Sequence, residues 1–165
     1  MSARRILKHI LTPHWMARRA FPRTVLNRIE AAIRESETTH AGELRFAVEA
    51  GLEPARLVRS VTPRQRAREV FAHLGVWDTE HNSGVLIYVQ LVDRRIEILA
   101  DRGISSKVDQ ATWDAICRRM EAAFRAGRFE AGALEGIGEI TALLARHYPA
   151  AGENPNELPD RPVVL

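Results

Sequence analysis

The 165-residue sequence lacks the features on which several large classes of function depend. It has a single cysteine, Cys117, which excludes an internal disulfide and the paired-cysteine spacing of a zinc knuckle. Cys117 lies at an apolar position of a predicted helix, where we expect a small buried hydrophobic residue and no nucleophile. The sequence also has no G-x-S-x-G elbow, no P-loop and no G-x-G-x-x-G motif, which argues against serine-triad and nucleotide-dependent chemistry.

Long apolar runs are missing as well. No uninterrupted stretch approaches the ~20 apolar residues that span a bilayer. Lys8 and His9 interrupt the apolar residues near the N-terminus, so no signal peptide is predicted. With 45% apolar residues and one cysteine, we expect one domain with a disulfide-free core in a reducing cytoplasm.

Acidic residues are absent before Glu30, and this makes the N-terminus basic while the rest of the chain is slightly acidic. The basic residues of this part are Arg4, Arg5, Lys8, Arg18, Arg19, Arg23 and Arg28. Residues 1–21 also contain apolar side chains, so we interpret them as a basic amphipathic segment. It could contact an anionic membrane peripherally, contact an unknown protein, act as a nucleic-acid arm, or pack its apolar stripe on the domain. No helix-turn-helix or aromatic-stacking pattern supports nucleic acid, so we expect no such partner.

Three segments have the composition of β-strands. The run from Val85 to Leu91 is apolar throughout and rich in β-branched residues, which predicts a central strand buried on both faces. Residues 43–50 alternate apolar and polar side chains, as a half-buried strand does. A polar turn at residues 92–95 separates the central strand from a third strand, Ile96 to Ala100, and predicts an antiparallel hairpin.

Helical patterns fill the remaining sequence. Pro22 opens a helix that ends near residues 36–39, and Thr62-Pro63-Arg64-Gln65 is an N-cap with a capping-box glutamine. Asp109 is a suitable N-cap for a helix that Gly127 ends, and residues 129–144 form a last helix. The order of elements, with two parallel strands joined by a crossover helix, predicts a small three-layer α/β/α sandwich with a mixed sheet. Residues 149–165 are rich in proline, which predicts an extended or disordered tail.

The predicted topology gathers polar residues at one end of the sheet, because both parallel strands start there and the third strand ends there. Carboxylates and imidazoles that converge could bind a divalent cation, and an oxygen-rich set favours calcium or magnesium over zinc. The candidate ligands are His40, Glu43, His81, Asn82, Asp101 and Asp109. Two of them also suit purely structural roles, since Asp109 serves as a helix cap and Asp101 can pair with Arg102 or Arg94.

Glu37, His40 and Glu43 form a second notable spacing across a helix-to-strand turn. Unlike a H-E-x-x-H helix, this spacing fixes no ligand geometry, because it crosses a break between elements. The alternative interpretation places Glu37 on a solvated helix end and His40 in an exposed turn.

Three segments, in order along the chain, resemble those of a known family. They are Asn82-Ser-Gly-Val-Leu-Ile-Tyr-Val, then Asp93 to Ile98 with Gly103, Ile104 and Asp109, and then Phe124-Arg-Ala-Gly-Arg-Phe129 with Gly132. The first is similar to an Asp-Asn-Gly-Val-Leu stretch, and the last to a Phe-Arg-x-Gly-x-(Tyr/Phe) pattern. By these segments, residues 22–148 resemble the TPM domain family, found in thylakoid-lumen and bacterial envelope proteins.

The resemblance implies a TPM-type sandwich, with divalent-cation binding and acid-phosphatase activity attributed to some members. The chain departs from the family pattern in two places. His81 precedes Asn82 where the family commonly has aspartate, and Ser83 is inserted before Gly84. Members often carry a signal peptide and a membrane anchor, and neither is predicted here.

Two hypotheses about function follow. The first is a non-catalytic TPM-type module that binds a cation or partner at the sheet end, in the cytoplasm or peripheral to the inner membrane. The alternative is a metal-dependent phosphomonoesterase, in which Asp101 and Asp109 hold the cation while His81 or His40 handles protons.

Overall fold

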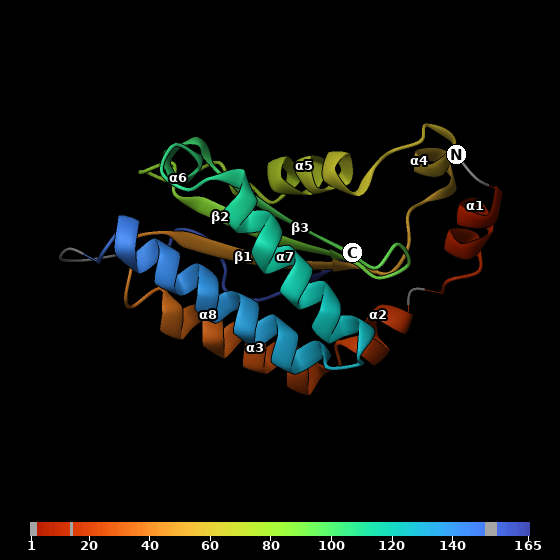
Figure 1. Cartoon of the computed structure of the whole chain (residues 1–165), viewed down its shortest axis with the longest axis horizontal. Helices are drawn as coiled ribbons and strands as arrows, with labels where there is room; N and C mark the ends of the chain where they lie inside the picture. Colours follow the sequence, from red (N-terminus) through yellow and green to blue (C-terminus); the bar gives the residue numbers. More distant parts are fainter. Residues whose placement is uncertain (1–2, 14, 151–154) are drawn as a thin grey trace.

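The apolar run predicted as the central strand forms β2 (Gly84–Gln90), whose seven residues are all buried. It pairs parallel with β1 (Glu43–Glu49) and antiparallel with β3 (Arg95–Ala100), which confirms the predicted sheet. The computed structural model describes residues 3–13, 15–150 and 155–165 of the chain. It adds a fourth strand, β4 (Val163–Val164), parallel to β1, so the sheet order is β3-β2-β1-β4 (Figure 1).

Three long helices cover one face of the sheet: α3 (Arg23–Ser36), α7 (Gln110–Arg125) and α8 (Phe129–His147). Their apolar positions pack on the side chains of β1, β2 and β3 that point to this face, including Phe46 and Ile87. Phe21 is fully buried among three other rings. Its ring centroid lies 5.7 Å from the centroids of Phe46, Phe124 and Phe129. This aromatic cluster joins the start of α3, the sheet and the α7–α8 turn into one core.

A shorter helix, α5 (Pro63–His73), covers the opposite face, and α4 (Pro54–Val58) precedes it. The predicted capping box is present, because Thr62 and Gln65 each accept a hydrogen bond from the backbone amide of the other. Ala67 and Val70 of α5 pack on Leu86 and on the ring of Tyr88. Helices on both faces make the predicted three-layer α/β/α sandwich.

The C-terminal tail lies along β1. Leu158 is buried in the core on the α5 side, and the amide of Leu165 donates to the carbonyl of Val48 at 2.8 Å. All seven residues of β1 are buried, so the prediction of a half-buried first strand is wrong. Its polar residues lose their contact with water because the tail and α5 cover the face on which they lie.

Two short helices, α1 (Ala3–Ile10) and α2 (Trp15–Ala20), form the N-terminal part. Figure 1 shows them at the end of the molecule away from α6 (Arg102–Ser105), which follows β3. In the part of the chain that the structure describes, no helix is both long and apolar enough to cross a bilayer.

Candidate functional site

The starts of β1 and β2 and the end of β3 lie side by side, as the predicted topology requires. Glu43 pairs with Gly84, and Val85 pairs with Ala100. The amide of Asp101 donates to the carbonyl of Gly84 at 2.8 Å, and the amide of Glu43 donates to the carbonyl of Ser83 at 3.2 Å. We call this end of the sheet the rim. It has an open part at β2 and β3 and a buried part at β1.

The open part centres on Asp101 and Asn82. Asp101 caps α6, with Oδ1 accepting from the amide of Arg102 at 2.7 Å. Its other carboxylate oxygen, Oδ2, is buried and has no hydrogen-bond partner among the described residues. Asn82 has a left-handed backbone, with φ of 51°, and its Oδ1 accepts from Nε of Arg102 at 2.8 Å. A left-handed backbone is ordinary for asparagine, whereas the buried acceptor without a partner requires an explanation.

Gly103 brings backbone oxygens close to this pair. A Cβ at this position would lie 2.6 Å from the carbonyl oxygen of Asn82 and 2.7 Å from that of His81. It would also lie 3.0 Å from the hydroxyl of Tyr148, so no side chain fits without a shift. Lys107 lies over the ring of Tyr148, with Nζ 4.0 Å from the ring centroid. The open part therefore combines oxygen donors with two cations, Arg102 and Lys107.

The buried part contains His40 and Glu43. His40 is fully buried, and its Nδ1 accepts from the amide of Gly42 at 3.2 Å. Burial lowers the pKa of His40, which favours the neutral ring. Glu43 is 1% exposed and accepts from the amide of Leu158 in the tail at 3.0 Å, and burial raises its pKa. Both side chains are shielded from solvent, and Glu43 connects the start of β1 to the tail.

Glu37 and Asp160 extend this buried part. Glu37 accepts from the amide of Leu44 at 3.0 Å, and burial raises its pKa to about 8, with the nearby Glu43 and Asp160 carboxylates adding to the shift. Asp160 accepts from Nε of Arg34 at 3.1 Å, and so links the tail to α3. Both Glu37 and His40 are buried, so the interpretation that placed them on a solvated helix end and in an exposed turn is wrong.

The remaining predicted ligands, His81 and Asp109, are exposed. Asp109 occupies the predicted N-cap of α7, although its side chain makes no capping hydrogen bond. Within residues 3–13, 15–150 and 155–165, no three His, Cys, Asp or Glu side chains are grouped so as to hold a metal. The six predicted ligands are thus divided between the open rim, the buried cluster and the surface.

Sequence reasoning missed Lys107 and Tyr148 of the open rim, and considered Arg102 only as a possible ion-pair partner of Asp101. The signal for Arg102 was present, since the Asp101-Arg102-Gly103 step ends a predicted strand. Tyr148 reaches the rim only through the packing of α8, which no local pattern reveals. The tail contacts were missed as well, although Val163-Val164-Leu165 is an apolar run inside the proline-rich segment.

Comparisons with known proteins agree with the fold described above. The family model of the TPM domain matches residues 18–143. The NMR structure of the BA42 protein from the psychrophilic bacterium Bizionia argentinensis is similar, with 30% sequence identity and a TM-score of 0.74. The similarity covers 85% of this chain and 92% of that one. The N-terminal domain of a protein from P. gingivalis has the same fold, with 16% identity, a TM-score of 0.63 and coverage of 85% of this chain and 94% of the other. No curated protein matches the sequence.

Proposed function

The chain belongs to the TPM domain family, and we propose that it is a non-catalytic binding module whose open rim holds a divalent cation, calcium or magnesium. The observation that carries the proposal is the buried Oδ2 of Asp101, which has no hydrogen-bond partner among the described residues. A buried carboxylate oxygen is costly to leave unpaired, and a bound cation would compensate that cost. Asp101 is also one of the ligands that the sequence predicts.

The neighbouring donors suit a hard cation. Asn82 supplies a side-chain amide oxygen, and the carbonyl oxygens of His81 and Asn82 lie close to Gly103, whose amide donates to the carbonyl of Asn82 at 3.1 Å. Calcium accepts mixed carboxylate, amide and carbonyl oxygens, whereas zinc favours nitrogen and sulfur. Arg102 opposes the cation, because its guanidinium adds positive charge and donates to Asn82 Oδ1. His40 and Glu43, which are buried beneath the tail, have a structural role in this proposal.

Calorimetric titration of the full chain with calcium chloride and with magnesium chloride tests the proposal. Asp101→Asn can still cap α6 but lacks the charge, so it should abolish the binding heat. Arg102→Gln should bind more tightly than the wild type, because it frees Asn82 Oδ1 and removes a competing charge. Asp114→Asn, on the exposed side of α7, is the control and should bind as the wild type does. The proposal fails if neither metal gives heat, or if Asp101→Asn binds like the wild type.

A non-catalytic role is supported by the state of the potential nucleophiles. Cys117 is buried, and burial raises the pKa of its thiol to about 12, so the thiolate is scarcely populated near neutral pH. The sequence also has no G-x-S-x-G nucleophile elbow that would supply a serine nucleophile in place of Cys117.

One observation favours the alternative of a metal-dependent phosphomonoesterase: Arg102 and Lys107 add positive charge to the rim, where a phosphoryl group would need it. Exposed His81 is better placed to exchange protons than buried His40. Turnover of p-nitrophenyl phosphate that requires an added metal and is lost in Asp101→Ala would favour the enzyme. Background rates with every metal would end this alternative.

A further inference from the structure

The N-terminal helices expose an unusual concentration of large apolar side chains. Seven large hydrophobic side chains are exposed in the described part of the chain, and four of them lie between positions 7 and 16. Leu7 is 57% exposed, Leu11 70%, Trp15 57% and Met16 40%. Single exposed apolar residues are ordinary, but four within ten positions of the sequence indicate an interaction surface. We call this group, with its helices, the N-terminal surface.

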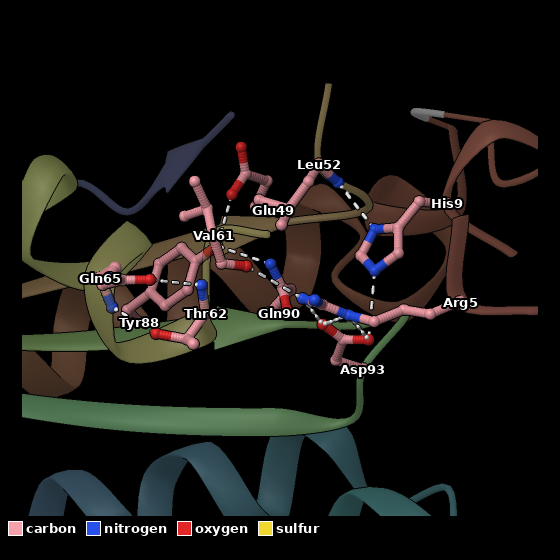
Figure 2. Close-up of polar contacts among 10 residues, drawn as sticks. All are labelled: Arg5, His9, Glu49, Leu52, Val61, Thr62, Gln65, Tyr88, Gln90 and Asp93. Carbon is pink, nitrogen blue, oxygen red and sulfur yellow. Dashed lines mark hydrogen bonds and ion pairs between the residues drawn. The ribbon is translucent and has the colours of Figure 1, made fainter. Parts of the chain in front are cut away.

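Helix α1 is attached to the protein by its polar side. The guanidinium of Arg5 lies 2.7 Å from the carboxylate of Asp93, which belongs to the β2–β3 turn, and also donates to the carbonyl of Val61. His9 is 3% exposed, with Nδ1 accepting from the amide of Leu52 at 2.9 Å and Nε2 lying 3.1 Å from Asp93. Figure 2 shows Arg5 and His9 pointing toward Asp93.

An ordinary surface helix buries apolar residues, whereas α1 contacts the protein through Arg5 and His9. Leu7 and Leu11 remain in solvent while Arg5 and His9 face the protein. Helix α2 is anchored by Ala17 and the following Phe21, both fully buried, and this leaves Trp15 and Met16 exposed. The apolar side chains have no place in the core, so a partner must cover them if they are to leave water.

The charge beside these side chains indicates the chemistry of that partner. Lys8, Arg18 and Arg19 are exposed on the same two helices, and no acidic residue precedes Glu30. Met16 also lines a cavity of about 230 Å³ to which Arg94, Arg95 and Arg125 contribute, together with Glu121, which pairs with Arg95 and Arg125. The rest of the chain is slightly acidic, so the basic excess of the sequence is concentrated before Glu30.

We propose that the N-terminal surface binds the anionic headgroup region of a phospholipid bilayer. Basic residues that flank exposed leucine and tryptophan suit this region, because the charges contact phosphates while the apolar side chains enter the acyl boundary. The contact is peripheral, and α1 and α2 lie flat on the lipid. Because α6 and the rim lie at the other end of the molecule, this surface is separate from the proposed cation site (Figure 1).

Co-sedimentation of the full chain with vesicles tests the charge dependence. The protein should sediment with vesicles that contain phosphatidylglycerol, should remain in solution with phosphatidylcholine alone, and should be released by salt. Arg18→Gln with Arg19→Gln should weaken binding roughly 30-fold, since each basic residue contributes about 1 kcal/mol and 1.4 kcal/mol is tenfold. The matched control, Arg118→Gln with Arg146→Gln on exposed parts of α7 and of the last turn of α8, should bind as the wild type does.

Two tryptophans of similar exposure allow a matched test of the apolar contribution. Trp15 is 57% exposed and Trp77, in the loop after α5, is 54% exposed. Trp15→Ser should weaken vesicle binding roughly tenfold or more, whereas Trp77→Ser should leave it unchanged. Both side chains lie outside the core, so both variants should melt close to the wild type.

Fluorescence gives an independent measure of insertion. In a Trp77→Phe variant, the remaining tryptophans are Trp15 and Trp113, and Trp113 is 2% exposed and shielded from lipid. A blue shift on adding phosphatidylglycerol vesicles would then report Trp15 entering the bilayer. The proposal is overturned if the protein does not sediment with anionic vesicles, if Trp15→Ser or the arginine pair binds normally, or if the emission does not move. Equal binding to phosphatidylcholine would also overturn it.

Discussion

Replacing Gly84 with alanine tests how closely β2 approaches the loop that precedes it. A Cβ at Gly84 would lie 1.9 Å from the carbonyl oxygen of Val76 and 2.9 Å from its Cγ1. Neither side can yield easily, because Val76 is fully buried and the backbone of Gly84 is paired to both Glu43 and Asp101. Overpacking destabilises a protein by about 1–3 kcal/mol. A clash with a backbone oxygen should cost at least as much as the upper value, because backbone atoms move less readily than side chains.

The expected loss is therefore about 3 kcal/mol or more, which lowers the melting temperature by roughly 6–12 °C in a chain of this size. The same substitution at Gly138 is the control, because that residue is exposed within α8 and a Cβ there meets nothing within 4 Å. Gly138→Ala should raise the melting temperature by about 2–4 °C, since alanine is the better helix former by about 1 kcal/mol. The melting temperatures of both variants are measured by calorimetry. A wild-type melting temperature for Gly84→Ala would refute the close approach of Gly84 to the backbone of Val76.

The remaining predictions concern the core and the buried acids. Ile87→Asp places an unpaired charge in the middle of β2, so it should cost several kcal/mol and leave little soluble protein, whereas exposed Arg128→Asp should stay within about 0.5 kcal/mol of the wild type in urea unfolding. The folded-state pKa of Glu37 is raised from 4.5 to about 8, so its contribution to stability is present below pH 4.5 and is lost as the pH rises toward 8. Glu37→Gln should remove the fall in the free energy of unfolding between pH 4.5 and about pH 8. If the variant changes its urea midpoint between these two pH values as much as the wild type does, the assignment to Glu37 is wrong.

The sheet and helices could be predicted because their signals are local. The apolar run of β2 reports burial on both faces, and the Thr62–Gln65 capping box reports the start of α5 through residues three positions apart. The antiparallel orientation of β3 followed from the short turn between β2 and β3, as expected for a hairpin. In each case the residues that determine the structure are close together in the sequence.

The buried part of the rim could not be predicted for the opposite reason. Glu43 is 115 positions from Leu158, whose amide it accepts, and Arg34 is 126 positions from Asp160. Glu37, His40 and Glu43 have the local pattern of exposed turn residues, yet all three are buried, and Glu43 is bonded to the distant tail. Composition alone suggested an extended or disordered tail, because proline is frequent there, and gave no indication of the side chains that it covers.

The two proposed sites lie at opposite ends of the molecule, so a substitution that abolishes binding at one site should leave binding at the other unchanged. Asp101 and Asn82 lie where β2 begins, whereas Trp15 belongs to α2, at the end where β2 finishes. With α1 and α2 on a bilayer, the rim would point away from the lipid and remain open to ions. Trp15→Ser should therefore leave calcium or magnesium titrations unchanged, and Asp101→Asn should leave vesicle sedimentation unchanged. If either variant affects both measurements, the two surfaces are coupled through the sheet, and the separation inferred from the fold is wrong.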